Sequence, residues 1–157
     1  TDGLVIVNVI ERKQAVVFFN NDLYEVHDGN GVILSIKQNY EGLSSLPLLV
    51  GKDASKNINA LLALVNEIGS YQSEVLYYEW VGERRWDIHM KSELVFKLPE
   101  NNLNKGLNVM RMFLRETNKL SKTVVSVDLR NIDKPIIRFR KAPPVEYIGK
   151  NVRRLAG

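Results

Sequence analysis

The hydrophobic pattern of residues 122–141 predicts two β-strands joined by a short turn. Apolar and polar residues alternate on both sides of residues 131–134, whose Asn and Asp side chains favour a turn. We expect one face to lie on a core. That inward set is Val125, Val127, Leu129, Ile137 and Phe139.

The second of these strands, residues 135–141, is predicted to be the last strand and to lie at a sheet edge. Ala142-Pro143-Pro144 follows it, and proline cannot continue a ladder because it has no backbone N–H. An edge strand presents unpaired backbone groups that a partner chain can use. This strand is therefore where we expect function.

The rest of the chain alternates between strand patterns and helical patterns. Strands are predicted at residues 4–11, 15–19, 23–26, 32–36, 75–81, 84–90 and 93–98. Residues 4–11 are apolar on both faces, which is typical of a buried strand. The core face of residues 84–90 carries Trp86, Ile88 and Met90.

Two amphipathic helices complete the pattern, at about residues 55–70 and 102–120. The first has an apolar stripe and ends at Gly69; the stripe is Ile58, Leu61, Leu62, Val65 and Ile68. Helices inserted between runs of strands predict an α+β domain, with a largely antiparallel mixed sheet and two main helices.

Length and composition fit one domain, or one domain with a piece of another. The chain has 157 residues, 45% of them hydrophobic, and no apolar run long enough to span a bilayer. Because Thr1 is not Met and the strand pattern begins at once, we expect further chain upstream. The absence of cysteine excludes disulfides and thiolate metal sites.

The net charge of +4 is mild, and only the C-terminal end is strongly basic. A basic tail suits nucleic acid, lipid headgroups or an acidic protein. The simpler interpretation of most of these charges is a solvated tail. Arg84-Arg85-Trp86 is the one basic cluster elsewhere, and Glu83 and Asp87 neutralise much of it.

No pattern in the chain predicts catalysis, a metal or a cofactor. His27 is expected in a hairpin turn and His89 on an exposed strand, too far apart to share a metal. No hydroxyl or thiol has a nearby base, and the paired carboxylates are those of any solvated hairpin. We therefore expect a protein that is not an enzyme.

Six short stretches, taken in order, carry a resemblance to a known family. They are Val9-Ile10-Glu11-Arg12-Lys13-Gln14-Ala15-Val16, Asp28-Gly29-Asn30-Gly31-Val32, Leu46-Pro47-Leu48-Leu49-Val50-Gly51, Arg84-Arg85-Trp86-Asp87-Ile88, Val95-Phe96-Lys97-Leu98-Pro99-Glu100 and Val127-Asp128-Leu129-Arg130. With this order and spacing, the chain resembles the extracytoplasmic β domain of the FtsQ/DivIB bacterial cell-division proteins. Gln14 stands where the family usually has proline.

The resemblance implies a domain plan and a role. Residues 1–14 would be the last strand of a POTRA domain, 15–141 the β domain and 142–157 a C-terminal tail. The protein would be a single-pass inner-membrane protein with this domain in the periplasm. It would act as a non-catalytic divisome scaffold, essential for septum formation, which links early and late division proteins by binding FtsB and FtsL. In family members FtsB adds a strand at the C-terminal strand region.

The expected partner-binding residues follow from this role and from the strand pattern. An incoming strand would bond the backbone from Ile136 onward, and Arg138 and Arg140 would suit an acidic partner. Arg130 enters through the match to the family's V-D-L-R strand, although it could simply pair with Asp128 or Asp133. Tyr147 could anchor a partner or fold back over the edge. The alternative function is a basic module that binds nucleic acid or anionic lipid through residues 142–157.

Overall fold

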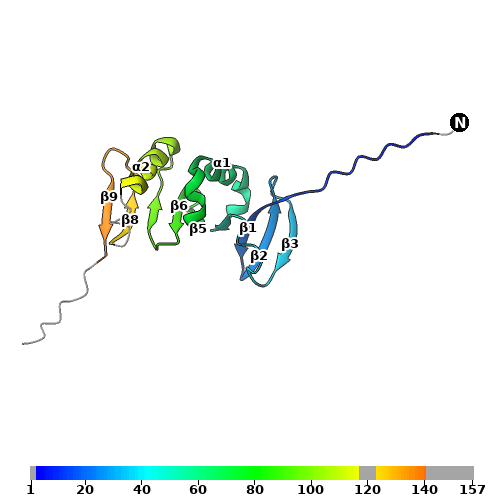
Figure 1. Ribbon diagram of the computed structural model, residues 1–157, viewed down its shortest axis with the longest axis horizontal. Coiled ribbons are helices and arrows are strands. Elements are labelled where there is room, and N and C mark those ends of the chain that lie inside the picture. Colours follow the sequence, from blue (N-terminus) through cyan, green and yellow to red (C-terminus); the bar gives the residue numbers. More distant parts are fainter. Residues whose placement is uncertain (1–2, 117–122, 141–157) are drawn as a thin grey trace, which may run out of the picture.

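The fold is described by a computed structural model covering residues 3–116 and 123–140. These residues form one nine-stranded sheet with the order β3-β2-β1-β4-β5-β6-β7-β8-β9 (Figure 1). The strands are β1 (Gln14–Asn20), β2 (Leu23–Asp28), β3 (Ile33–Lys37), β4 (Leu48–Val50), β5 (Val75–Val81), β6 (Arg85–Met90), β7 (Val95–Lys97), β8 (Val124–Asp128) and β9 (Ile136–Phe139). The helices are η1 (Ala54–Asn57), α1 (Ile58–Ile68), η2 (Gly69–Glu74) and α2 (Leu103–Glu116).

Most neighbouring strands are antiparallel and follow one another along the chain as hairpins. The parallel pairs are β1–β4, β4–β5 and β7–β8. A parallel pair needs a long crossover. Accordingly, α1 lies between β4 and β5 in the chain, and α2 lies between β7 and β8. The predicted α+β class, with a largely antiparallel sheet and two helices, is confirmed.

The two helices cover one face of the sheet, where the main core lies (Figure 1). Their buried residues are Ile58, Leu61, Leu64, Val65, Ile68, Gly106, Leu107 and Met110. Trp86, Ile88 and Met90 face this core as predicted, and they are at most 4% exposed. The first helical stripe needs a small correction, because Leu64 is buried while Leu62 packs only at the border of the core.

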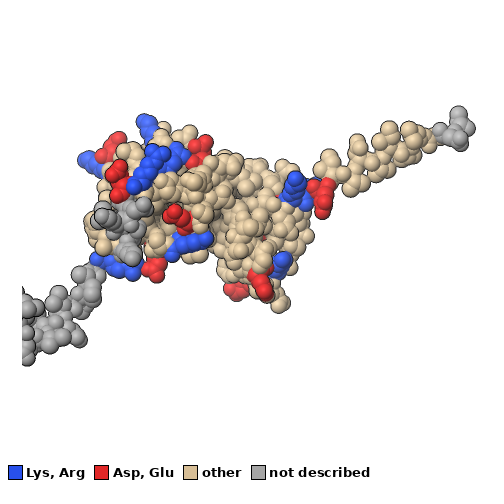
Figure 2. All heavy atoms as spheres, in the orientation of Figure 1, with Lys and Arg blue, Asp and Glu red and all other residues tan. Residues whose placement is uncertain are grey.

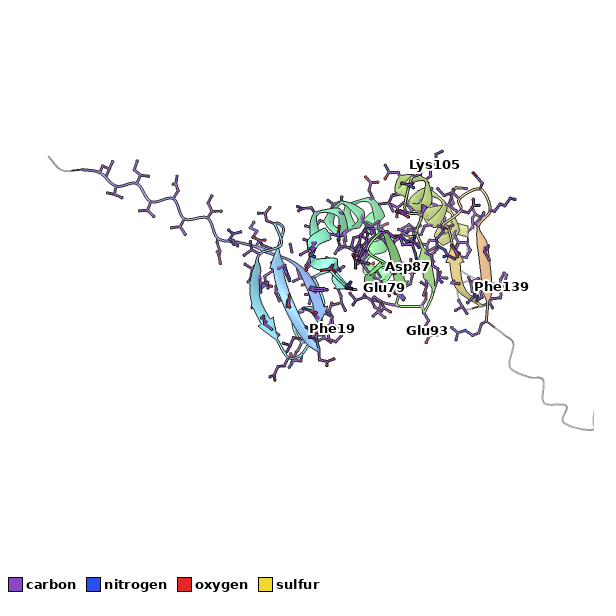
Figure 3. All side chains as sticks on the ribbon, turned by 180° about the vertical axis from the view of Figure 1, so that it is seen from behind. Phe19, Glu79, Asp87, Glu93, Lys105 and Phe139 are labelled. Carbon is purple, nitrogen blue, oxygen red and sulfur yellow. The ribbon has the colours of Figure 1, made fainter. Side chains whose placement is uncertain are left out.

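On the opposite face, the described residues form a second apolar cluster over the first strands. Val16 and Phe18 of β1 belong to the main core, whereas Val17 between them packs on the other face against Val26 and Leu43. The connection between β3 and β4 supplies the cover there. Further along the sheet, some of the residues on that face are polar, among them the cross-strand neighbours Glu79 and Asp87 (Figure 3).

Tight turns fix the hairpins as their residue types predict. Asn21 and Asp22 both have positive φ, 48° and 63°, between β1 and β2. Gly82 and Glu83 have φ of 58° and 56° between β5 and β6. Two consecutive residues with positive φ match the twist of flanking strands. These turns set the register of the two hairpins.

The strand predicted at residues 4–11 does not form. This segment has no regular structure, and Figure 1 shows it leading away from β1. Its apolar side chains are 74–89% exposed: Leu4, Val5, Ile6, Val7, Val9 and Ile10. A strand needs a neighbour to complete its hydrogen bonds, and none of the described residues pairs with this segment. Its assignment to a preceding POTRA domain stays a prediction.

Candidate partner-binding edge

The predicted closing hairpin is present, and β9 is the outermost strand on its side of the described sheet. β8 and β9 pair antiparallel, with Val127 opposite Ile137 and Ser126 opposite Arg138. The turn is closed by Asn131, whose carbonyl oxygen accepts from the Lys134 N–H at 3.2 Å. The edge position expected for this strand is thereby confirmed.

A β-bulge at Val125 changes which side chains of β8 reach the core. Val124 pairs with Phe139 and Ser126 with Arg138, so Val125 is the extra residue. A bulge interrupts the two-residue alternation. As a result Val124 is buried and Val125 only partly so, which corrects the prediction that Val125 faces the core; Val127 and Leu129 are buried as predicted.

The apolar residues of β9 are exposed, contrary to the prediction that Ile137 and Phe139 pack inward. They lie on the predicted face, opposite the buried Val127 and Val124. Nevertheless they are 42% and 58% exposed, and Ile136 on the other face is 66% exposed. No residue of β9 belongs to the main core. The helices cover β8 but leave β9 open, as Figure 3 shows for Phe139.

Two backbone N–H groups of β9 find no acceptor in the rest of the described sheet. The Arg140 N–H points toward β8 and donates to the Thr123 carbonyl oxygen at 2.7 Å. Because N–H groups alternate in direction along a strand, those of Arg138 and Ile136 also point toward β8. The N–H groups of Ile137 and Phe139 therefore point away from the described sheet. These two positions are the ones that an added strand would bond.

The three arginines predicted to bind a partner differ in whether they form ion pairs within the described residues. Arg130 binds Asp128 through two nitrogens, with Nε to Oδ1 at 2.9 Å and Nη2 to Oδ2 at 2.6 Å. The hydrogen bonds from the Arg130 side chain are the largest cause of the lowered pKa of Asp128. Arg140 donates from Nη2 to Glu93 Oε2 at 2.7 Å. Arg138 makes no ion pair with the described residues, and Tyr147 lies outside them.

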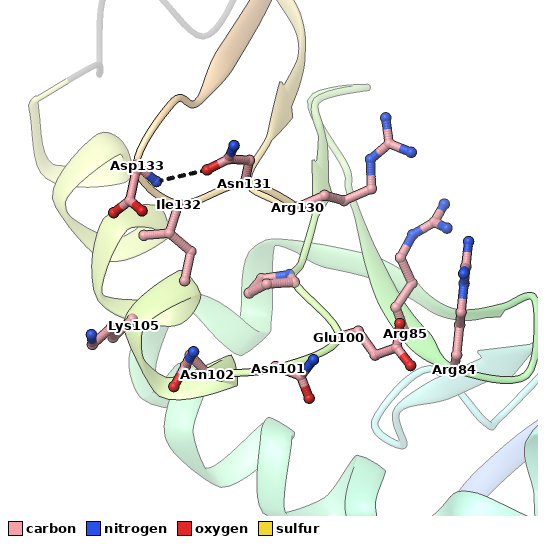
Figure 4. A pocket seen from close by; sticks show the side chains of 11 residues that line it. Arg84, Arg85, Glu100, Asn101, Asn102, Lys105, Arg130, Asn131, Ile132 and Asp133 are labelled. Atoms are coloured by element: carbon pink, nitrogen blue, oxygen red, sulfur yellow. Dashed lines mark hydrogen bonds between the residues drawn. The ribbon is translucent and has the colours of Figure 1, made fainter.

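Arg130 also lines an open pocket of about 550 Å³, which we call the hairpin pocket. It lies between the β5–β6 turn, the residues before α2 and the β8–β9 turn (Figure 4). Its charged residues are Arg84, Arg85, Lys105, Arg130, Glu100 and Asp133. Cations therefore outnumber carboxylates, and Figure 4 shows the three arginines extending toward the same side. Figure 2 shows basic side chains gathering at this end of the molecule, interspersed with acidic ones.

The association of Arg84 and Arg85 with Arg130 was missed at the sequence level. The expected neutralisation is present only in part: Arg85 Nε lies 3.2 Å from Asp87 Oδ1, whereas Glu83 pairs with Lys52 instead. The pairing directions of β6, β7 and β8 could have revealed this association, because they bring the start of β6 and the end of β8 to the same edge of the sheet. β6 begins at Arg85 and β8 ends at Asp128, and these strands flank β7 with their register at Asp87, Lys97 and Asp128.

The two histidines lie apart, and the position expected for one of them is wrong. His27 is not in a turn but in β2, where it is 2% exposed and contacts Gly31 and Glu25. His89 is half-buried on β6, stacks on Tyr77 and contacts Glu79. Among residues 3–116 and 123–140, no group of three potential ligands could hold a metal ion. In the same residues, no helix has the length and apolarity of a membrane span.

Comparison with known proteins decides the family. The model of the family described as "Cell division protein FtsQ/DivIB, C-terminal" matches residues 15–130. The chain belongs to this family. The matched FtsQ/DivIB region runs from β1 to the end of β8, so β9 lies just beyond it.

Individual FtsQ proteins are similar over most of the chain. Cell division protein FtsQ of Rhizobium radiobacter is 32% identical over 132 residues, 83% of this chain and 62% of that protein. The FtsQ of Zymomonas mobilis is 29% identical over 147 residues, 93% of this chain and 46% of that protein. The chain thus spans about half the length of these relatives. A solved extracytoplasmic domain of DivIB from Geobacillus stearothermophilus is 14% identical with a TM-score of 0.47, covering 71% of this chain and all of that domain.

Proposed function

We propose that this domain is a non-catalytic scaffold of the bacterial division machinery, which binds an acidic partner by strand addition at β9. The observation that carries the proposal is the open edge itself. Ile137 and Phe139 present outward N–H groups and exposed side chains. An added strand would gain backbone hydrogen bonds and cover apolar surface at once.

The charges around the edge favour a partner with carboxylates. Arg138 is unpaired with the described residues, and Arg140 and Arg130 are each 54% exposed. The hairpin pocket adds Arg84 and Arg85 beside Arg130. An exposed ion pair contributes little to stability, so Arg140 can exchange the 75% exposed Glu93 for a partner's carboxylate at small cost.

Family membership supports the identity of the partner and the location. In the resemblance described above, the strand is supplied by FtsB, in a pair with FtsL. We propose the same pair here, acting on a periplasmic domain anchored in the inner membrane by a helix upstream of residue 1. Arg130, Ile136, Arg138, Arg140 and Tyr147 are the proposed partner-binding residues.

The proposal is tested by calorimetric titration with the extracytoplasmic part of the FtsB–FtsL pair of the same organism. Ile137→Pro removes an outward N–H without removing a bond to β8, so the fold should survive. We expect at least about tenfold weaker binding, because a lost hydrogen bond and a steric obstacle act together. Circular dichroism verifies the fold of the variant.

Charge reversal tests the electrostatic part. Arg138→Glu combined with Arg140→Glu should weaken binding by at least about tenfold, whereas Lys37→Glu on the opposite edge strand should leave it unchanged. Binding that survives both the proline and the charge-reversal variants would place the interface elsewhere. Binding to DNA or anionic vesicles that disappears when residues 142–157 are removed would instead support the basic-tail function.

A further inference from the structure

Two arginines of the hairpin pocket are held by carboxylates that do not themselves line it. Arg130 donates to Asp128 from Nε at 2.9 Å and from Nη2 at 2.6 Å. Arg85 donates from Nε to Asp87 Oδ1 at 3.2 Å. Asp87 is 5% exposed and the Asp128 side chain 16%, and only the arginines reach the pocket. We call Arg85 and Arg130 the anchored arginines.

The pairing of three strands brings both ion pairs to one place. Asp87 on β6, Lys97 on β7 and Asp128 on β8 are cross-strand neighbours, so they form a row on one face of the sheet. Arg85 precedes Asp87 by two residues, and Arg130 follows Asp128 by two. Because β6 is antiparallel and β8 parallel to β7, the anchored arginines extend from the same end of this row.

The row acts as one electrostatic network rather than as two separate pairs. Lys97 lies between the two carboxylates and attracts both. The pKa of Arg130 is raised mainly by its hydrogen bonds to Asp128, and the Asp87 carboxylate adds to this shift. Charges that are buried and hydrogen-bonded in this way hold a defined geometry. The network therefore fixes the inner side of each guanidinium group.

The outer side of each guanidinium group has donors left for a ligand. An arginine has five N–H donors. In the described part of the chain, neither Nη1 of Arg130 nor the Nη groups of Arg85 donate to an acceptor. Figure 4 shows both side chains extending toward the same side of the pocket. A guanidinium group that is already fixed loses less freedom when it binds a carboxylate.

We propose, on the basis of the function proposed above, that Asp87 and Asp128 are positioning residues, which hold the anchored arginines ready for a carboxylate of the incoming partner. Charge alone predicts the reverse effect, since an aspartate repels an acidic partner. Neutralising either aspartate therefore distinguishes positioning from repulsion by the sign of its effect on binding.

Calorimetric titration with the FtsB–FtsL pair measures this sign. Asp128→Asn should weaken binding by at least about fivefold, because Arg130 is no longer held in its binding orientation. Asp87→Asn should weaken binding in the same direction through Arg85. Asp133→Asn is the matched control, since Asp133 lines the same pocket and its carboxylate pairs with none of the described residues. Its neutralisation should leave binding unchanged or slightly tighter.

A double-mutant cycle separates positioning from damage to the fold. In the Arg130→Ala background, Asp128→Asn should cause no further loss of affinity, because Asp128 acts through Arg130. A purely structural defect would weaken binding in both backgrounds. Nitrogen-15 spectra of the free chain give a second measure. The Arg130 Nε–H signal should exchange slowly with water in the wild type and faster in Asp128→Asn, while the backbone amide spectrum keeps its dispersion.

Three outcomes would overturn the proposal. Unchanged or tighter binding of both Asp→Asn variants, where Arg130→Ala binds weakly, would exclude positioning and leave the proposed function standing. Rapid exchange of the Arg130 Nε–H in the wild type would show that its guanidinium group is not held. A wild-type chain that does not bind the FtsB–FtsL pair would remove the proposed function and, with it, the role of both aspartates.

Discussion

At the scale of single residues, Asp28 shows how one buried carboxylate organises a hairpin. It is 4% exposed and accepts the backbone N–H groups of Val32 at 2.8 Å and Asn30 at 2.9 Å, and it pairs with Arg12. The Val32 N–H is the largest cause that lowers the pKa of Asp28, with the Arg12 contact adding to it. Asp28 therefore connects the β2–β3 hairpin to the segment that enters β1.

This geometry predicts an acid-sensitive contribution to stability. Because the pKa of Asp28 is lower in the folded than in the unfolded chain, its contribution is present above the unfolded pKa of about 3.9 and is lost as the pH falls below it. Asp28→Asn should unfold at lower urea than wild type at about pH 7 and should differ less at about pH 3. Urea titration at both pH values measures this.

Asp133→Asn is the matched control for Asp28, since Asp133 lies in an exposed turn and no pair involving its carboxylate is present among the described residues. Asp128 also has a lowered pKa, so the acid dependence of Asp28→Asn should be reduced rather than abolished. An Asp28→Asn variant that keeps the full difference between the two pH values would contradict this account.

Substitution of Tyr78 should not reduce the free energy of unfolding, in contrast to substitution of Asp28. Removing a buried hydroxyl that has no partner among the described residues relieves a desolvation cost, so Tyr78→Phe should change the free energy of unfolding by no more than about 1 kcal/mol, on the stabilising side. Phe96→Ala, at a fully buried core position, should destabilise by about 3–5 kcal/mol. Denaturant titration of both variants checks this. A clear loss of stability in Tyr78→Phe would show that the hydroxyl is already bonded.

At the scale of elements, α2 is held close to the end of β7 by a glycine. A Cβ at Gly106 would lie 2.5 Å from Pro99 Cδ, which belongs to a rigid ring. Glycine to alanine in a helix normally stabilises. Here Gly106→Ala should destabilise by about 1–3 kcal/mol, because the helix must shift off the sheet. Thermal unfolding measures this, and Asn104→Ala, exposed on the same helix, should be neutral or slightly stabilising.

The elements also show what alternation in a sequence can and cannot predict. It placed the hairpins, the two helices and the edge position of β9 correctly, because turn residues and apolar spacing are local. It gave the right face for Ile137 and Phe139 but the wrong burial, because burial depends on how far a helix reaches across the sheet. It missed the bulge at Val125, which no residue type signals.

At the scale of the whole molecule, residues far apart in the chain are brought together by the parallel pairing of β7 and β8. That pairing places Arg130 beside Arg84 and Arg85 in the hairpin pocket. From the sequence, Arg130 was predicted as a partner-binding residue only through a family motif, and Arg84-Arg85 was considered only a minor, largely neutralised basic cluster. The N-terminal segment, residues 4–11, was mispredicted as a strand for a similar reason. Its strand pattern says nothing about whether a neighbouring strand is present.

The central claim is that β9 accepts a strand through the outward N–H groups of Ile137 and Phe139. Residue-resolved hydrogen exchange, with and without the FtsB–FtsL pair, tests it most directly. In the free domain the amides of Ile137 and Phe139 should exchange quickly, while that of Arg140, bonded to Thr123, is protected. Partner binding should slow Ile137 and Phe139 selectively. Binding that leaves both amides unprotected would contradict strand addition at this edge.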